Sequence, residues 1–518
     1  MNVLLVSIDS LRRDFLGAYR DTPDVVDYEV KTENLDRFAE RATVFDANYA
    51  GSLPCMPARR EWLAGVREFL WRSWGPIEPF DRTIPQLARE EDIVTQLVTD
   101  HYHYFQHGAR GYFEDFNGFD FVRGHEYDAW KTAPREPDSE LIDQINANSP
   151  ESQRFLNRAA YARNVEEFDD YSDFFAPKVF SKAVERIEGN SKWDQWFTYV
   201  DSFDVHEPFH CPEPYASMYT DEDPEDVDLP VWPYYGRVKE GQSELSKREL
   251  DFVRSQFAGK VTMVDEQFGR LLDKLDEEGL WNETMVVVTS DHGYFLGDHG
   301  WIGKNDPPVY DVLARTPLMV WHPDSDREGE HVDALTSAVD LYPTILEGLG
   351  INAPEWTHGH SHLPVTLGEH DDHRDWALYG YWGATMNVTD GQYTYHHPNR
   401  GAEPPLNHST SMVNPYGWFV PPEVQQEATA GEFLPYTDAP VWRYAPSNQD
   451  GPEEHLKVSV QHDEPLLYDT EMDRRQETNI ADTDAEKQSE MLNLLVDAME
   501  SLEAPQTEFD RLELGRSA

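Results

Sequence analysis

Polar residues that can bind a metal or transfer a proton gather at the ends of four apolar runs in this sequence. In chain order they are Asp9; Asp100, His101 and His103; Asp201, Asp204 and His206; and Asp291 and His292. Carboxylate and imidazole groups bind divalent cations, and imidazole also exchanges protons near neutral pH. A single Asp after a strand commonly forms a turn or caps a helix. Four such ends together favour one divalent-metal site with acid–base partners.

A second reactive feature is the segment Cys55-Met56-Pro57-Ala58-Arg59. Pro57 suits the first turn of a helix, which predicts that Cys55 lies at the helix N-terminus, where free N–H groups and the helix dipole favour anions. Arg59 follows one turn later and can return its guanidinium toward the same point. A nucleophile there would meet an oxyanion held by positive groups. An isolated cysteine is otherwise a small buried hydrophobe, which we expect for Cys211.

The elements that position these residues follow from the apolar patterns. Predicted buried strands are Val3–Asp9, Ile93–Thr99, Trp196–Asp201, Met285–Ser290 and Pro317–Trp321. Helical spacing is found at Asn34–Ala42, within Leu245–Glu278, and at Val339–Leu349 before Gly350. The alternation predicts an α/β fold with a large, mostly parallel central sheet flanked by helices. Ligands of such sheets bind beyond the carboxyl ends of the strands, which is where the polar residues gather.

The pattern changes after about Leu367. Short strands at Trp376–Trp382, Gln392–His396 and Pro465–Asp469 indicate a small antiparallel sheet. An irregular, proline-rich stretch at about Pro398–Pro452 separates them, and a helix at Ala485–Leu502 follows. We therefore predict a catalytic α/β domain over residues 1–367 and a smaller C-terminal α+β subdomain over residues 368–518.

Charge limits the partners of the chain. Of its 518 residues, 98 are acidic and 43 are basic, so the formal net charge is −55. A field of this sign repels nucleic acid and anionic membranes, and an anionic substrate would need local positive charge. Only 12 of the basic residues are lysines, among them Lys304. The acid excess runs along the whole chain, which favours a halophilic protein whose surface is suited to high salt.

Compartment is predicted from the absence of targeting signals. The apolar start of the chain, up to Asp9, is too short for a membrane span and lacks the basic start of a signal peptide. A disulfide between Cys55 and Cys211 is poorly motivated in a large chain without an export signal. We predict a cytoplasmic protein.

Several segments together resemble the sulfatase family of the alkaline-phosphatase superfamily. Cys55-Met56-Pro57-Ala58-Arg59 is similar to the family signature C-x-P-x-R, whose Cys is converted to formylglycine. The other similar segments, in the family's order, are Asp9-Ser10-Leu11-Arg12-Arg13-Asp14, His206-Glu207-Pro208, Thr289-Ser290-Asp291-His292-Gly293, Leu296-Gly297-Asp298-His299-Gly300 with Gly303-Lys304, and Leu467-Tyr468-Asp469 through Asn479-Ile480-Ala481. The resemblance spans nearly the whole chain and implies an alkaline-phosphatase-like fold.

The resemblance implies hydrolysis of sulfate esters. Asp9, Asp291 and His292 would bind one divalent cation together with the modified Cys55. The family commonly uses calcium, and some relatives use manganese or another transition metal. Hydrated formylglycine at position 55 would supply a geminal diol, one hydroxyl of which attacks sulfur while the other later expels sulfate. A formylglycine-generating maturation factor is then a required partner.

The resemblance also implies roles for six further residues. Arg59 would stabilise the nucleophile and the charge on the ester oxygens, while Lys304 and His206 contact the sulfate and protonate the leaving oxygen. His103 would contact the oxyanion or transfer a proton. His101 and His299 would contact the substrate.

One departure from the family pattern concerns the first metal-binding segment. Many sulfatases carry two adjacent Asp residues there, whereas Asp9 is followed by Ser10. A single Asp is similar to the phosphonate monoester hydrolase branch, which shares the formylglycine and cleaves phosphonate monoesters and phosphodiesters. His101 and His103 also stand where relatives carry Lys-x-His.

Three hypotheses remain open at this point. The first is a formylglycine-dependent sulfatase of the arylsulfatase type, acting on a small-molecule or saccharide sulfate ester. The second is a phosphonate monoester or phosphodiester hydrolase on the same scaffold. The third is a metal-stabilised binding protein with unmodified Cys55, which would bind ligand without turnover. Neither the leaving group nor the oligomeric state can be read from the sequence.

Overall fold

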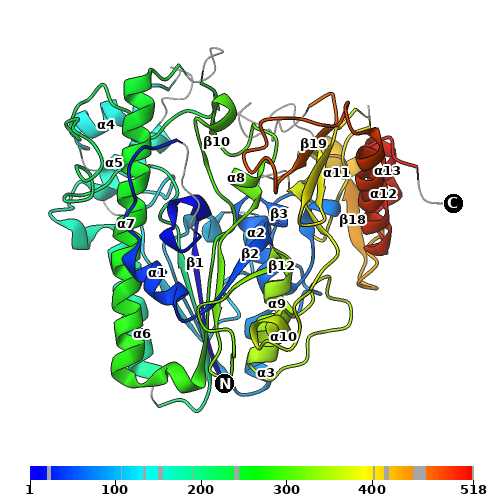
Figure 1. The fold of residues 1–518 in the computed structure, drawn as a ribbon, viewed down its shortest axis with the longest axis horizontal. Coiled ribbons are helices and arrows are strands. Elements are labelled where there is room, and N and C mark those ends of the chain that lie inside the picture. The colour runs from blue at the N-terminus through cyan, green and yellow to red at the C-terminus, as the bar shows by residue number, and fades with distance from the viewer. Residues whose placement is uncertain are drawn as a thin grey trace.

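An eight-stranded sheet forms the centre of the computed structural model (Figure 1). The structure describes residues 1–19, 25–106, 108–131, 136–149, 156–190, 192–238, 244–400, 403–413, 419–446 and 462–515. Across the sheet the strands are β12 (His331–Ser337), β2 (Thr43–Tyr49), β11 (Leu318–Trp321), β8 (Thr284–Thr289), β1 (Asn2–Ile8), β6 (Trp196–Ser202), β4 (Val94–Thr99) and β5 (Gly118–Phe121). Only β11 pairs antiparallel with its neighbours, so the predicted mostly parallel sheet is confirmed.

The sheet register brings the strand ends to one edge. Strand β1 is buried along its whole length between β6 and β8. Ser7 of β1 pairs with Asp201 of β6 and with Thr289 of β8. Asp9 and Asp291 therefore follow two adjacent strands at the same level, and Asp201 lies two residues earlier, near the end of the neighbouring β6.

Helices cover both faces of the sheet. Alternating side chains of β1 point to opposite faces. Leu4, Val6 and Ile8 pack in a core with α1 (Glu33–Ala39), α6 (Phe175–Asn190) and α7 (Lys247–Glu278). Val3 and Leu5 pack in a second core with α2 (Cys55–Ala64), α3 (Ile84–Glu90) and α9 (Leu341–Gly348). Figure 1 shows the long α7 running along one side of the sheet and α2, α9 and α3 on the other.

The predicted helices have clear end signals. The Ser246 side chain accepts from the backbone N–H of Glu249 at the start of α7, and Gly279 ends that helix with a left-handed backbone at φ 68°. Glu33–Ala39, Leu341–Gly348 and Ala485–Ser501 (α12) match the other three predicted helices to within a few residues. Shorter helices are α4 (Ser139–Asn146), α5 (Leu156–Val165), α8 (Asp311–Ala314), α10 (Leu363–Thr366), α11 (Pro422–Glu427) and α13 (Gln506–Arg511).

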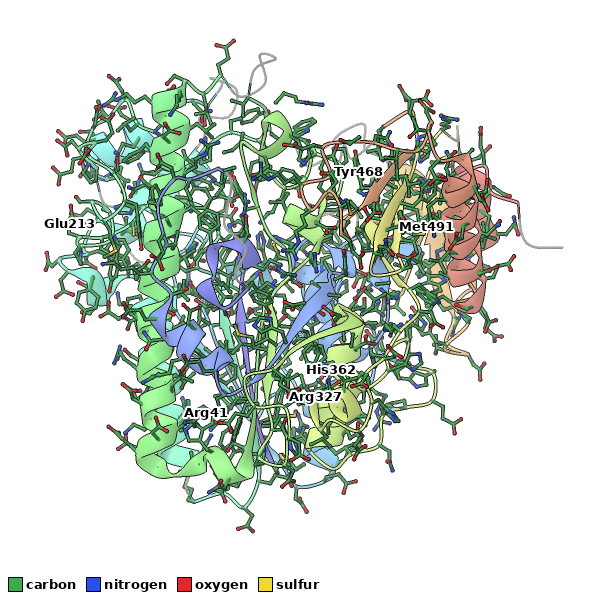
Figure 2. All side chains as sticks on the ribbon, viewed as in Figure 1. Arg41, Glu213, Arg327, His362, Tyr468 and Met491 are labelled. Atoms are coloured by element: carbon green, nitrogen blue, oxygen red, sulfur yellow. The ribbon has the colours of Figure 1, made fainter. Side chains whose placement is uncertain are left out.

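A smaller, mostly antiparallel sheet lies beside the nucleophile helix. Its order is β19 (Leu466–Asp469), β15 (Tyr393–His397), β14 (Met386–Thr389), β13 (Ala377–Tyr381) and β3 (Ser52–Leu53). Strand β3 ends two residues before Cys55, so the start of α2 is attached to this sheet. Helix α12 covers the sheet, and Met491 is part of the core between them (Figure 2).

The stretch predicted as irregular contains regular structure. Strands β16 (Asn407–Ser409), β18 (Val441–Tyr444) and β17 (Thr429–Gly431) form a three-stranded sheet within it. The prediction of an irregular Pro398–Pro452 was therefore wrong for these residues, while 401–402, 414–418 and 447–452 lie outside the described part. A further three-stranded sheet consists of β7 (Gly236–Arg237), β10 (Trp301–Gly303) and β9 (Phe295–Leu296). Within the described ranges, no helix is long and apolar enough to cross a membrane.

Candidate active site

Cys55 lies at the predicted position, the first residue of helix α2. Its side chain is buried, with 2% of its surface exposed. The turn before it is fixed by Glu61, one side-chain oxygen of which accepts from the Ser52 backbone N–H at 2.7 Å. Cys55 and Cys211 are both free thiols, and Cys211 packs in the core around α7 as predicted.

Four candidate metal ligands converge on one point. Ligand atoms of Asp9, Cys55, Asp291 and His292 all lie within 4.8 Å of one another. His292 Nε2 is 3.3 Å from Cys55 Sγ, and Asp9 Oδ1 is 3.9 Å from the same sulfur. His292 Nδ1 lies 2.9 Å from the Gly293 carbonyl oxygen. When Nδ1 donates to that oxygen, Nε2 keeps its lone pair for a metal.

The electrostatics of this group fit a divalent cation. Burial alone would raise the pKa of Asp9, but Arg59 and His101 hold it well below its usual range. Burial and the charge of Asp9 raise the pKa of Asp291 to about 7, whereas burial and Lys304 lower the pKa of His292 to about 3. Two crowded carboxyl groups and a neutral imidazole are a suitable ligand set for such an ion.

Arg59 neutralises the carboxylates around the cysteine. Its guanidinium pairs with Asp201 at 2.8 Å, with Asp9 at 3.0 Å and, at still closer contact, with Asp291. It also donates to the Cys55 carbonyl oxygen at 3.1 Å. The prediction that Arg59 turns back toward Cys55 is confirmed, because its guanidinium reaches the Cys55 carbonyl oxygen. The positive charge of Arg59, however, is paired with the three Asp carboxylates. The sequence had not indicated a partner for Asp201.

Lys304 provides positive charge beside the nucleophile position. Its Nζ lies 3.6 Å from Cys55 Sγ and 3.4 Å from Ser10 Oγ, and the residue is buried. Burial would lower the pKa of Lys304, but the charges of Cys55, Glu207 and Asp9 raise it. Lys304 is therefore a buried cation where a bound oxyanion would lie.

His206 lies in the loop that follows β6. Its Nδ1 is 2.8 Å from the Glu207 carbonyl oxygen, and its ring stacks on Phe203 with centroids 4.2 Å apart. Burial and Lys304 lower the pKa of His206 well below its usual value. Lys260 of α7 holds this loop, because its Nζ donates to the carbonyl oxygens of His206 at 3.1 Å and Pro208 at 2.7 Å. Sequence reasoning missed Lys260, whose only signal is a lysine on a buried face of α7.

The two histidines after β4 have different surroundings. His101 is fully buried, its Nε2 lies 3.5 Å from Asp9 Oδ2, and burial together with Arg59 lowers its pKa to about 3. His103 is slightly exposed and contacts Gln106 at 2.9 Å through Nδ1 and Glu126 at 3.3 Å through Nε2. His101 therefore borders the metal group, and His103 points to a separate acidic group.

Asp100 and Asp204 belong to a different buried group, which corrects the expectation that all four strand ends build one cluster. Asp100 and Asp204 form a second buried group with His125. Asp204 pairs with Lys260 at 2.5 Å and with His125 at 3.1 Å, and Asp100 accepts from the Phe203 backbone N–H at 2.7 Å. These contacts fix the loop that carries His206, because they bind Phe203 and Asp204, which come shortly before it.

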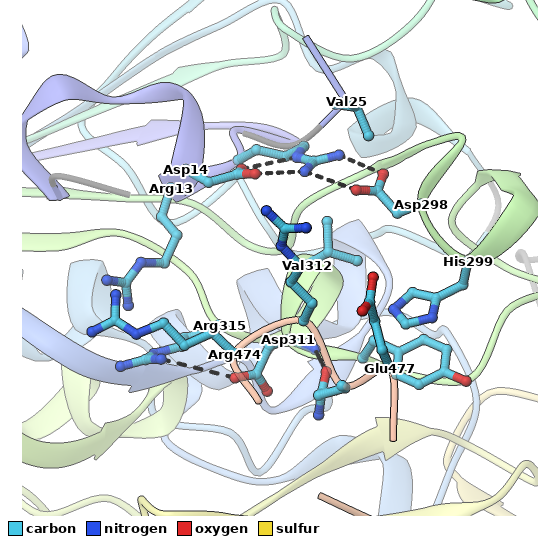
Figure 3. Close-up of a pocket in the computed structure, with 14 residues that line it drawn as sticks. Arg13, Asp14, Val25, Asp298, His299, Asp311, Val312, Arg315, Arg474 and Glu477 are labelled. Carbon is cyan, nitrogen blue, oxygen red and sulfur yellow. Dashed lines mark hydrogen bonds and ion pairs between the residues drawn. The ribbon is translucent and has the colours of Figure 1, made fainter. Parts of the chain in front are cut away.

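His299 borders a neighbouring cavity. Its ring stacks on Tyr310 with centroids 4.0 Å apart, and burial lowers its pKa. The cavity has a volume of about 460 Å³, and its wall includes Arg13, Arg315 and Arg474 (Figure 3). Arg12, which follows the Asp9 segment, is held there by Asp14 and Asp298. His299 is therefore placed in the wall of this cavity, and its role in substrate contact stays a prediction.

Comparison with known proteins defines the family. The family model described as Sulfatase matches residues 1–351. Over 419 residues the chain is 27% identical to the multifunctional alkaline phosphatase superfamily protein PehA of Trinickia caryophylli, covering 70% of this chain and 76% of that protein. It is 23% identical over 386 residues to an arylsulfatase of Clostridium perfringens, covering 69% and 76%.

A solved structure supports the fold. The phosphonate monoester hydrolase of Agrobacterium radiobacter superposes with a TM-score of 0.64 at 19% identity, covering 98% of this chain and 96% of that one. The chain belongs to the sulfatase family and has the alkaline-phosphatase-like fold of its structural neighbours. It is an enzyme of the sulfuric ester hydrolase class.

Proposed function

We propose that the protein hydrolyses sulfate monoesters with a formylglycine formed from Cys55 and one divalent cation held by Asp9, Asp291, His292 and residue 55. The observation that carries the proposal is the meeting of these four ligands within 4.8 Å, with Lys304 Nζ 3.6 Å from Cys55 Sγ. A nucleophile position, a metal site and a buried cation then share one point at the end of β1.

The unmodified thiol is a poor nucleophile in this site. Burial and the charge of Asp9 raise the pKa of Cys55, which keeps the thiol protonated at neutral pH. Hydrated formylglycine supplies a hydroxyl nucleophile, and the divalent cation supplies Lewis-acid activation. The carboxylates favour calcium and His292 favours manganese or another transition metal; calcium is our first choice. A maturation factor that oxidises Cys55 is a required partner.

The remaining residues bind the ester and protonate its leaving oxygen. Lys304 contacts the sulfate oxygens, while Arg59 holds the pKa of Asp9 low and orients Asp9 and Asp291. His206, held by Lys260, carries the proton for the leaving oxygen. His101 fixes Asp9, while His103 and His299 contact the substrate further from the nucleophile. The substrate is a small-molecule or saccharide sulfate, and the protein acts in the cytoplasm.

A phosphonate monoester or phosphodiester hydrolase is the second candidate. Ser10 replaces the second Asp of many sulfatases, and its hydroxyl donates to Asp9 Oδ1 at 2.8 Å. One carboxylate fewer leaves a less negative metal site, which would tolerate a phosphonate as well as a sulfate. The structural similarity to a phosphonate monoester hydrolase supports the same candidate.

The test compares two esters with one leaving group. Purified protein is assayed with para-nitrophenyl sulfate and para-nitrophenyl phenylphosphonate, which release the same phenol. We expect kcat/KM to be about tenfold or more higher for the sulfate, with loss of both activities in Cys55→Ala and after metal chelation. A reversed ratio would favour the second candidate. Turnover that Cys55→Ala retains would refute both.

A further inference from the structure

Two buried glutamates next to His206 have no part in the steps described above. Side-chain ligand atoms of Glu126, His206 and Glu207 lie within 4.8 Å of one another. Glu207 directly follows His206, and Glu126 comes from the segment after β5. Their exposed fractions are 6% for Glu126 and 2% for Glu207, so both carboxylates are more than nine-tenths buried.

Among the residues that the structure describes, one oxygen of each glutamate finds no hydrogen-bond donor. Glu207 Oε1 accepts from the Tyr235 hydroxyl, but Glu207 Oε2 accepts no hydrogen bond. His206 Nδ1 lies 3.3 Å from Oε2 but is directed at the backbone carbonyl oxygen of Glu207. Glu126 Oε2 also accepts none, with His103 Nε2 at 3.3 Å. Burial and the charge of Glu126 raise the pKa of Glu207 against the lowering by Lys304. A buried carboxylate oxygen that accepts no hydrogen bond is unfavourable unless a ligand compensates it.

The backbone at Glu126 also has an unusual conformation. Its φ is 46°, a left-handed value that a non-glycine residue seldom adopts. Such a conformation persists only where the surrounding structure fixes it. At this residue the carboxylate lies within 4.8 Å of the Glu207 carboxylate.

The position of the pair relative to the nucleophile indicates which part of the substrate it meets. His103 Nε2 lies 3.3 Å from Glu126 Oε2, and the rings of His103 and His101 have centroids 5.1 Å apart. His101 Nε2 in turn lies 3.5 Å from Asp9 Oδ2, so the pair is close to the metal group. In the function proposed above, His206 faces the leaving oxygen, and Glu207 is its neighbour in the chain. The two glutamates therefore flank the alcohol part of the ester.

We propose that Glu126 and Glu207 form a subsite for a cationic amine on the alcohol part of the substrate, so that the preferred substrates are sulfate esters of amine-bearing alcohols. An ammonium group has three N–H donors, which two carboxylates can accept. A metal ion is a poorer fit for this site. His206 Nδ1 already faces a carbonyl oxygen, and the two carboxylates alone are fewer ligands than such an ion needs. The metal and Lys304 would take the anionic end of such a zwitterion and the glutamates its cationic end.

The test rests on the proposed function and uses two matched esters. These are para-(aminomethyl)phenyl sulfate and para-ethylphenyl sulfate, which differ in size by almost nothing and in charge by one. We expect kcat/KM of the wild type to be about tenfold or more higher for the amine, and this ratio to approach one in Glu207→Gln and in Glu126→Gln. Glu423→Gln, which changes an exposed carboxylate of α11, is the control and should keep the wild-type ratio. A wild-type ratio near one would overturn the subsite and leave the sulfatase proposal intact.

Calorimetry with the two phenols separates the subsite from the reaction. We expect para-hydroxybenzylamine to bind the wild type at least about tenfold more tightly than para-ethylphenol, and Glu207→Gln to lose this difference. Such binding without turnover of any ester would support the subsite while the proposed function fails. Metal analysis of the purified variants tests whether the two glutamates bind a metal ion and not an amine. An ion that is lost from Glu126→Gln and Glu207→Gln but kept in His292→Ala would show that they do, and would overturn the amine proposal.

Discussion

At the scale of single residues, the site depends on the balance of buried charge. Arg59 faces Asp9, Asp201 and Asp291, and Lys304 is the additional cation beside Cys55. Charges removed from water must be paired, so each change of one partner affects the protonation of the others. The protonation of His206 depends on this balance, because burial and Lys304 lower its pKa.

The first prediction concerns the pH dependence of the reaction. Only protonated His206 can donate to the leaving oxygen, and its depressed pKa means that this form is lost as pH rises above a value below about 6.5. We expect kcat/KM to fall with increasing pH above that value. The corresponding fall in kcat should lie at higher pH, because bound sulfate stabilises the imidazolium.

The variant His206→Gln tests this assignment. It should remove the alkaline fall and lower kcat about 100-fold or more for an alkyl sulfate, but much less for para-nitrophenyl sulfate, whose leaving oxygen needs little protonation. Equal losses for both esters, or an unchanged pH profile, would show that another residue carries the proton.

At the scale of secondary-structure elements, the apolar runs determined where the ligands meet. The runs that became β1 and β8 are continuous, so their ends at Asp9 and Asp291 could be predicted from the sequence. Strand β2 was missed because Asp46 and Asn48 interrupt its apolar pattern, and β5 was missed because it is a short, half-buried edge strand. A period-two pattern is weak in both cases.

Contacts between loops were beyond sequence reasoning. The meeting of Glu126 with Glu207, and of Lys260 with the loop of His206, depends on how separate segments fold over the sheet edge. No periodic pattern in the sequence predicts these contacts. Asp9, Asp291 and His292 could be named from the sequence because each follows a predicted strand, whereas Glu126 and Lys260 could not be.

The second prediction concerns this loop. Lys260→Met keeps most of the apolar side chain but removes the donors to His206 and Pro208. It also leaves Asp204 with one buried charge partner fewer. We expect the free energy of unfolding in urea to fall by about 3 kcal/mol, and kcat to fall about tenfold with little change in KM.

A second variant distinguishes positioning from mere stability. In Lys260→Met/Asp204→Asn the uncompensated charge is gone, so part of the lost stability should return, while kcat stays low because the loop carbonyls remain unheld. Recovery of kcat together with stability would argue against a positioning role for Lys260.

At the scale of the whole molecule, the net charge of −55 dominates. Repulsion among so many carboxylates destabilises the compact state, and salt screens it over a Debye length that shrinks to about 3 Å at 1 M. The excess of acidic residues therefore predicts a protein suited to high salt. The cations at the nucleophile are the local exception that an anionic ester requires.

The third prediction follows from this charge. The Tm should rise by several degrees between low salt and about 1 M KCl, and NaCl at equal ionic strength should give the same rise. Thermal unfolding followed by circular dichroism provides the measurement. A Tm that is flat or falls with salt would contradict the halophilic interpretation.

The most direct test of the central claim is the mass of the tryptic peptide Ala42–Arg59 from protein purified out of its native host. Conversion of Cys55 to formylglycine makes this peptide lighter by about 18 Da, while the peptide that carries Cys211 should keep its unmodified mass. The proposed mechanism predicts that loss in most of the material. An active preparation in which Cys55 is wholly unmodified would contradict it, because the buried, protonated thiol would then have to act by another route.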